Sequence, residues 1–154
     1  MNILSSQPPA SLTLTALSGI PLLNPGDNLV LIILQSLKQS NLSLENGDIL
    51  VIAQKVVSKA EGRYARLADI IPSERAFKLA EITGKDPRLV ELILSESREI
   101  VRHSKRTIQS SGVVVAENRQ GIVLANAGID SSNVGSESED EKVLLLPIDP
   151  DKSA

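Results

Sequence analysis

The chain has 154 residues, the length of one ordinary domain, and a domain of that size buries roughly 70% of its unfolded surface. A net charge of −3 and a nearly complete lack of aromatic residues argue against nucleic acid as a partner. The absence of cysteine excludes disulfides and thiolate-ligated zinc. No apolar run is long enough to cross a membrane, and Met1–Ala10 lacks the basic and apolar regions typical of a signal peptide, so we expect a cytoplasmic protein without a membrane partner.

The first third of the chain predicts two strands and one helix. Ser11–Leu17 alternates apolar and polar residues, which indicates a strand. Asp27 is placed to cap a helix over Leu29–Leu37, which is apolar on nearly every face and should be largely buried. Ile49–Ala53 is a short continuous apolar run, typical of a strand that is covered on both faces.

The middle of the chain predicts two helices with clear start signals. Ser73 can cap a helix over Glu74–Thr83, and Gly84 can end it. Asp86 and the proline after it begin a second helix, whose apolar stripe continues to Val101.

The last third predicts a β-hairpin, a loop and a final strand. Gly112–Ala116 and Gly121–Ala125 are apolar runs joined by four polar residues, which is a hairpin signal. Residues 135–142 indicate an acidic surface loop, and Val143–Leu146 indicates a last strand. Asp149 reads as a helix start, and because chains seldom end on a start signal, we expect the first part of a longer protein.

These elements predict one α+β domain over residues 1–154, with a mixed β-sheet packed against two or three helices. The most informative polar residues lie in Gly121–Val134, where an apolar strand breaks at a small-residue turn. Asp130 and Asn133 follow that break, three residues apart. Short polar side chains after a buried strand are how many α/β proteins bind phosphates and metals. The alternative is an ordinary turn, since these residue types are common in loops.

A second candidate site follows Ile49–Ala53, where Gln54, Lys55 and Lys59 come directly after the expected strand. Lysines fixed at a strand end can neutralise phosphate oxygens as point charges, although the spacing is not that of a Walker motif. The alternative is a solvated basic turn. His103, the only histidine, would follow the second predicted helix, where a surface role is expected.

Several blocks of the sequence, in their order and spacing, resemble one protein family. The blocks are Gly19–Leu23, Asn46–Val51, Gln54–Arg63, Pro72–Ala76, Asn126–Val134 and Leu146–Ala154. From about Leu17 onward the sequence is similar to the coenzyme F-420-0 gamma-glutamyl ligases. The resemblance implies a GTP-dependent ligase that adds L-glutamate, in gamma linkage, to the deazaflavin precursor of coenzyme F-420.

The resemblance also implies which residues bind the nucleotide and the metal, and it assigns no catalytic residue. Asp130 would bind a divalent cation, either magnesium or manganese, and potassium is a further candidate ion. Family members are expected to form homodimers. Gln54 departs from the small hydroxyl residue that other members carry. The implied nucleotide contacts are Ile20, Pro21, Leu22, Leu23, Gln54, Lys55, Lys59 and Asn133.

The family pattern continues past this sequence with a further metal-binding Asp-Thr pair and more nucleotide contacts. One carboxylate does not normally hold a catalytic divalent ion, so we expect little or no ligase activity from this chain alone. The alternatives are a non-catalytic nucleotide- or cofactor-binding remnant, a subunit of a split enzyme, or a shared scaffold with different chemistry.

Overall fold

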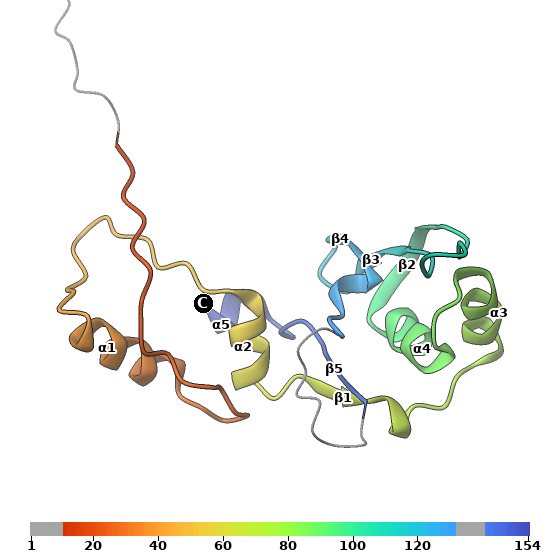
Figure 1. Ribbon diagram of the computed structural model, residues 1–154, viewed down its shortest axis with the longest axis horizontal. Helices are drawn as coiled ribbons and strands as arrows, with labels where there is room; N and C mark the ends of the chain where they lie inside the picture. The colour runs from red at the N-terminus through yellow and green to blue at the C-terminus, as the bar shows by residue number, and fades with distance from the viewer. Residues whose placement is uncertain (1–10, 132–140) are drawn as a thin grey trace, which may run out of the picture. The chain divides into compact units, whose positions relative to one another are not determined.

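The structure is a computed structural model that describes residues 11–131 and 141–154 (Figure 1). Contacts cluster in two compact units. Of the described residues, the first unit holds residues 11–22 and Asn28–Ile49, and the second holds Leu23–Asp27 and the rest from Leu50 onward. The expectation of one domain over residues 1–154 stays a prediction. Within the described ranges, no helix is long and apolar enough to cross a membrane.

The first unit contains helix α1 (Leu29–Gln39). Its N-cap is Asn28, whose Oδ1 accepts from the Leu31 amide at 3.1 Å, so the expectation that Asp27 caps this helix is wrong. Asp27 instead accepts from the Asn24 amide at 2.7 Å, within a turn of the second unit. The predicted strand over Ser11–Leu17 is also wrong, because the described residues give it no partner strand to satisfy its N–H and C=O groups.

Helix α1 is mostly exposed, which overturns the expectation that it is largely buried. Only Ser36 and Leu37 are buried, whereas Leu31 is 62% exposed. The Ser36 hydroxyl donates to the Ser18 carbonyl oxygen at 2.5 Å, which fixes one side of the helix. An all-round apolar helix needs cover on every side, and the described part of this unit covers only one.

In the second unit, helices α3 (Glu74–Thr83) and α4 (Pro87–Ser95) begin where the sequence predicts. The Ser73 hydroxyl accepts from the Ala76 amide at 3.2 Å, and the Asp86 carboxylate accepts from the Arg88 amide at 2.8 Å. Gly84 ends α3 in the left-handed conformation, as expected. The two helices lie side by side (Figure 1). Buried apolar side chains of both helices belong to one core cluster.

Beside these helices lies an antiparallel sheet of β2 (Ser97–His103), β3 (Val114–Asn118) and β4 (Val123–Ala125), in that order. Strands β3 and β4 confirm the predicted hairpin. The expectation that the second helix continues to Val101 is wrong, because α4 ends at Ser95 and the chain then enters β2. His103 is exposed at the end of β2, so it lies on a strand and not after a helix.

A second antiparallel pair joins β1 (Tyr64–Arg66) to β5 (Lys142–Leu144). Strand β5 confirms part of the predicted last strand, and Asp149 caps a short helix, α5 (Pro150–Ser153), as expected. Two 3-10 turns, η1 (Leu67–Asp69) and η2 (Asn126–Gly128), complete the regular elements of the described chain. Of the predicted acidic loop, residues 135–140 lie outside the described residues.

One hydrophobic core holds the second unit together. Buried side chains from α3, α4, β3, η2 and β5 meet in it, with Val90, Ile93 and Val114 fully buried. Burial of an aliphatic side chain of this kind stabilises a fold by about 1.5–3 kcal/mol. The predicted α+β class, with helices packed on a sheet, is confirmed.

The segment from Ile49 to Ala53 belongs to no strand, so the predicted strand covered on both faces is wrong. Ile49 and Val51 are 85% and 83% exposed. No strand of the described residues pairs with this segment. Helix α2 (Gln54–Ala60) begins immediately after it.

Candidate functional site

The basic segment forms helix α2, so Gln54 and Lys55 lie in a first helical turn and not at a strand end. The Gln54 amide donates to the Ser58 hydroxyl at 2.5 Å, and Ser58 is fully buried. The N-cap residue Ala53 has no side chain that can accept a hydrogen bond, and the first turn has no acidic residue. The buried side of α2 therefore includes Ser58, and Lys55 lies in the first turn of the helix.

Asp130 follows a turn with an unusual backbone. Asn126, Ala127 and Gly128 have φ values of 52°, 54° and 80°, so three consecutive residues are left-handed. The buried Asn126 Oδ1 has no hydrogen-bond partner among the described residues. Directly after this turn, the main chain of Asp130 forms a β-bridge with Leu144. The bridge fixes the position from which the Asp130 carboxylate projects.

The two candidate segments meet at one ion pair. Lys55 Nζ lies 2.5 Å from Asp130 Oδ2, and the two side chains are 33% and 30% exposed. The sequence assigns Lys55 to the nucleotide and Asp130 to a cation, and the structure brings both residues together. An ion pair on a protein surface usually contributes about 0–1 kcal/mol to stability.

Lys59 lies one turn after Lys55 on α2, so the two ammonium groups project from the same side of the helix. Lys59 is partly exposed, and the described residues contain no carboxylate in ion-pair contact with it. This side of α2 therefore presents two positive charges, one of them neutralised by Asp130.

The other predicted nucleotide residues take no part in this ion pair, and their roles stay predictions. Ile20, Pro21 and Leu22 belong to the first unit, where Leu22 is 90% exposed. Leu23 belongs to the second unit and is partly buried. Asn133 lies outside the described residues, so its role stays a prediction.

Arg63 ends the block Gln54–Arg63, and the sequence does not reveal which residues it contacts. Its Nε donates to the Leu146 carbonyl oxygen at 2.8 Å, and its guanidinium lies 3.4 Å from Glu96. Its own carbonyl oxygen accepts from the Leu145 amide. Arg63 thus ties the start of β1 to the chain after β5. No spacing signal marks these long-range partners.

The described residues do not by themselves fit a divalent cation. Magnesium and calcium need several oxygen ligands, whereas no group of three carboxylate or histidine side chains gathers anywhere in residues 11–131 and 141–154. Asp130 is one carboxylate, and an ammonium group already contacts it. The assignment of Asp130 to a metal stays a prediction that needs further ligands.

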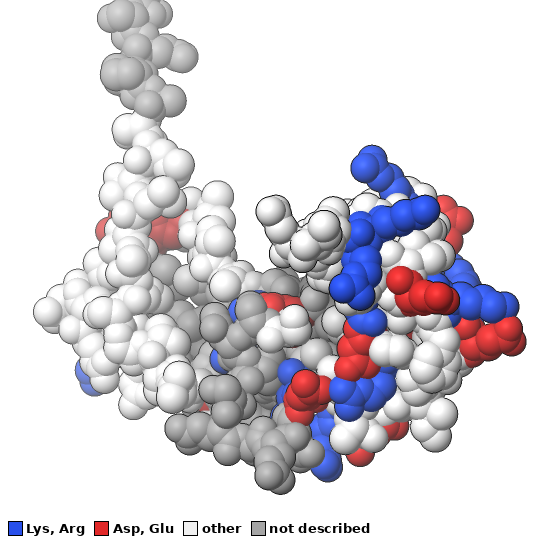
Figure 2. All heavy atoms as spheres, turned by 45° about the vertical axis from the view of Figure 1, so that its right-hand side comes forward, with Lys and Arg blue, Asp and Glu red and all other residues white. Residues whose placement is uncertain are grey.

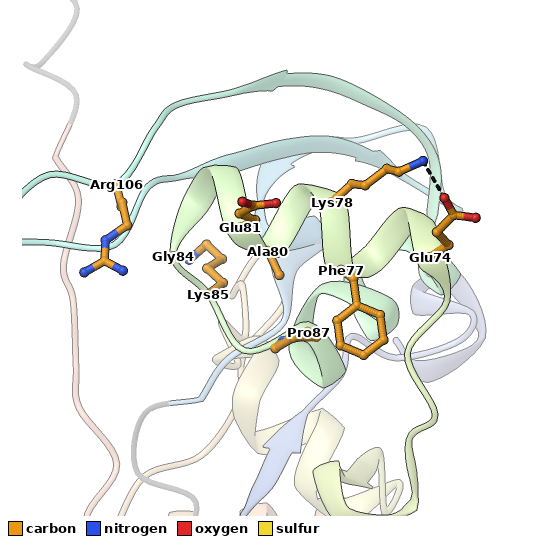
Figure 3. A pocket seen from close by; sticks show the side chains of 9 residues that line it. All are labelled: Glu74, Phe77, Lys78, Ala80, Glu81, Gly84, Lys85, Pro87 and Arg106. Atoms are coloured by element: carbon orange, nitrogen blue, oxygen red, sulfur yellow. Dashed lines mark ion pairs between the residues drawn. The ribbon is translucent and has the colours of Figure 1, made fainter.

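An open pocket of about 580 Å³ is lined by residues of helix α3, by the segment Gly84–Pro87 and by Arg106 (Figure 3). Its charges are of both signs, and Lys78 pairs with Glu74 at 2.6 Å. Burial lowers the pKa of Lys85 at its rim. None of the predicted site residues lines it, so it carries no part of the candidate site. The lining residues are Glu74, Phe77, Lys78, Ala80, Glu81, Gly84, Lys85, Pro87 and Arg106.

Basic and acidic side chains are interspersed on the face drawn in Figure 2. Mixed charges of this kind create no extended positive field, which nucleic acid binding requires. The exclusion of a polyanion partner stays a prediction. The pair of lysines on α2 is a local arrangement that could neutralise a small phosphate ligand as point charges.

Comparisons with known proteins place the chain in a class of ligases. Residues 19–154 match the model of the family described as F420-0:Gamma-glutamyl ligase. The coenzyme F420:L-glutamate ligase of Methanothermobacter thermautotrophicus is 46% identical over 143 residues, which are 93% of this chain and 53% of that protein. That of Methanopyrus kandleri is 47% identical over 130 residues, or 84% and 46% of the two chains.

A third coenzyme F420:L-glutamate ligase, from Methanocaldococcus jannaschii, is 42% identical over 111 residues, which are 72% of this chain and 40% of that protein. The chain belongs to the F420-0:gamma-glutamyl ligase family, which confirms the resemblance found in the sequence. It spans about half the length of the curated relatives that it matches.

Proposed function

We propose that this chain is the nucleotide-binding portion of a GTP-dependent ligase that adds L-glutamate, in gamma linkage, to the deazaflavin precursor of coenzyme F420. The observation that carries the proposal is the contact between Lys55 and Asp130, which joins the two blocks that the family pattern assigns to nucleotide and cation. The relatives named above as coenzyme F420:L-glutamate ligases support the substrate class.

In the proposed reaction, a carboxylate oxygen of the precursor attacks the γ-phosphorus of GTP, and the bond to the β-phosphate oxygen breaks to release GDP. The glutamate amine then attacks the acyl carbon of the acyl phosphate, loses a proton, and expels phosphate to leave an amide. Because charge shifts between phosphate oxygens in the first step, the ammonium groups of Lys55 and Lys59 would stabilise it as point charges.

The other predicted nucleotide contacts complete this proposal. Ile20, Pro21, Leu22 and Leu23 would form a loop against the nucleotide, and Gln54 and Asn133 would donate or accept hydrogen bonds to it. Asp130 would contribute one oxygen ligand to magnesium or manganese, whose role in such reactions is to balance phosphate charge. The remaining ligands would come from the half of the relatives that this chain does not match. Potassium is a further proposed ion.

We also propose that the complete protein is a cytoplasmic homodimer. Exposed apolar side chains on α1, namely Val30, Leu31 and Leu34, support association, because contiguous apolar surface of this kind often marks an interface. Sedimentation velocity at several concentrations tests the dimer. A single monomeric species at all concentrations would contradict it.

The nucleotide site is tested by calorimetric titration of the chain with GTP, with and without magnesium. We expect weak binding that magnesium improves and that Asp130→Ala or Lys59→Ala abolishes. The matched control is Lys78→Ala, which removes an equally charged, paired lysine from α3 and should bind like the wild type. Equal binding by all four proteins would remove these residues from the site.

A split enzyme is the second candidate, since the chain covers only 53% of its Methanothermobacter relative. Glutamate addition to the deazaflavin precursor should yield no product with this chain alone. Addition of the unmatched half of the relative in trans should restore product if the two halves form one site. Robust turnover by the chain alone would contradict the proposed division.

A further inference from the structure

We propose that the open pocket beside helix α3 is a second binding site, for a small organic acid whose carboxylate is attached to a planar apolar group (Figure 3). The lining of this pocket includes no residue of the candidate nucleotide site. The proposal therefore goes beyond the ligase function and does not rest on it. It starts from an exposed aromatic ring and two cations that line the same pocket.

The floor of the pocket is apolar and recessed. Phe77, Ala80 and Gly84 follow one another at intervals of three and four residues, so they lie on one side of α3. Ala80 has a short side chain and Gly84 has none, which lowers the surface between Phe77 and Arg106 (Figure 3). Phe77, the only phenylalanine of the chain, is 54% exposed, and an exposed ring can stack on a planar group of a ligand.

Arg106 is held at the other end of this floor by its main chain. Its amide donates to the Ile82 carbonyl oxygen at 3.0 Å. Its side chain packs so closely on Gly84 that a Cβ there would lie 2.8 Å from Arg106 Cδ. The glycine therefore makes room for the arginine, and the base of the arginine side chain has a defined place. A guanidinium group can bind both oxygens of one carboxylate.

The charged groups of Lys85 and Arg106 are not used to end the helix. Cations after a helix commonly bind its last carbonyl oxygens, but here main-chain amides do so. The Thr83 carbonyl oxygen accepts from the Gly112 amide at 2.6 Å, and that of Ile82 accepts from Arg106. Among the described residues, no carboxylate is in ion-pair contact with Lys85 or Arg106. Both side chains can therefore bind an anion.

Lys85 carries a cost that an anion would offset. Burial lowers the pKa of Lys85, because the ammonium group has lost water that no carboxylate replaces. A ligand carboxylate between Lys85 and Arg106 would supply the missing negative charge. The exposed ring of Phe77 would then lie against the apolar part of the same ligand.

The charges of the whole lining favour a ligand with one negative charge. The lining carries three cations, Lys78, Lys85 and Arg106, and two carboxylates, Glu74 and Glu81, so one positive charge is in excess. Lys78 already pairs with Glu74 at 2.6 Å. A phosphate dianion would exceed the available positive charge, and Glu81 would repel it more than a carboxylate.

The test is a titration with benzoate, followed by nuclear magnetic resonance of the chain with isotope-labelled phenylalanine. Because Phe77 is the only phenylalanine, every ring signal comes from the pocket. Benzoate should shift these signals in a saturable way. Benzamide has the same shape without the charge and should bind at least about fivefold more weakly, which is the contribution of one exposed ion pair of about 1 kcal/mol.

Arg106→Gln and Lys85→Gln should each lower the benzoate affinity toward that of benzamide. Lys105→Gln is the matched control, since Lys105 is exposed next to Arg106 but does not line the pocket, and it should bind like the wild type. Circular dichroism verifies that the variants are folded, and the comparison of benzoate with benzamide needs no variant. Equal affinities for the two compounds, ring signals that do not saturate, or a loss in Lys105→Gln as large as in Arg106→Gln would overturn the proposal. No nucleotide is present, so a failure of GTP binding is a separate result.

Discussion

The main chains of Asp130 and Leu144 exchange two hydrogen bonds, with N–O distances of 2.9 and 2.8 Å. Leu144 also pairs with Tyr64 across the β1–β5 ladder, and its side chain is 1% exposed. The main chain of Asp130 is therefore attached to a strand residue, Leu144, whose side chain is buried. The position of the Asp130 main chain therefore depends on how Leu144 packs.

Leu144→Ala should destabilise the second unit by about 2–5 kcal/mol, because it leaves a cavity beneath the strand that carries the bridge to Asp130. Urea unfolding followed by circular dichroism measures the change. Ile148→Ala is the control, since Ile148 is 73% exposed and should change stability by at most about 0.5 kcal/mol. Similar unfolding midpoints for the two variants would contradict the placement of Leu144 in the core.

Ser73 links the start of α3 to Glu91 on α4, and this link should appear in the pH dependence of stability. The Ser73 hydroxyl and amide donate to Glu91 Oε2 at 2.6 and 2.8 Å. The hydroxyl, and next the amide, hold the pKa of Glu91 below its usual value. Since the folded-state pKa is the lower one, this contribution is present at neutral pH and lost as the pH falls below about 4.3.

Ser73→Ala should therefore cost about 1 kcal/mol at pH 7 through loss of the helix cap. It should also lose less further stability than the wild type as the pH falls toward 3. Urea unfolding at the two pH values measures both effects. Glu91→Gln retains the cap and should show the same flatter pH profile. A Ser73→Ala profile as steep as that of the wild type would refute the link.

Gly128 is required for two separate reasons, and a pair of variants separates them. Its φ of +80° strains any other residue, and an added Cβ would lie 2.6 Å from Leu146 Cδ1. Gly26 has a similar φ of +89° but nothing within 4 Å of such a Cβ. Gly26→Ala should cost about 1 kcal/mol, and Gly128→Ala clearly more. Equal thermal shifts would mean that the contact with Leu146 relaxes freely.

Asn126→Gly should stabilise the chain by about 1 kcal/mol. Glycine adopts the observed φ of 52° without strain, and the substitution removes a buried oxygen that has no hydrogen-bond partner in the described structure. A rise in the thermal midpoint is the expected result. A fall would show that the Asn126 side chain makes a stabilising interaction.

Local signals in the sequence predict α3, α4 and the β3–β4 hairpin, because caps and turns act over a few residues. Strand identity is different, since it depends on partners elsewhere in the chain. The run from Ile49 to Ala53 has the composition of a buried strand but no partner in the described residues. The apolar stripe after Ser95 could be helix or strand, and pairing with β3 decides it.

The candidate site, too, depends on contacts between distant segments that the sequence does not predict. Residue types and order select Lys55 and Asp130 as candidates, and the structure adds that their side chains are in contact. The sequence does not predict that they neutralise each other, because a distance between segments so far apart depends on the bridge to Leu144. Arg63 ends the block Gln54–Arg63 that contains the two lysines, yet its partners are Leu146 and Glu96.

The bridge between Asp130 and Leu144 has a consequence for synthesis of the protein. A ribosome makes the chain from its N-terminus, so Lys55 and its helix emerge long before β5 exists. Until Leu144 has left the exit tunnel, nothing in the described fold fixes the Asp130 main chain in this bridge. The pairing of Lys55 with Asp130 in this geometry therefore waits for β5, and a nascent chain that stalls before β5 would carry its lysines without their fixed counter-charge.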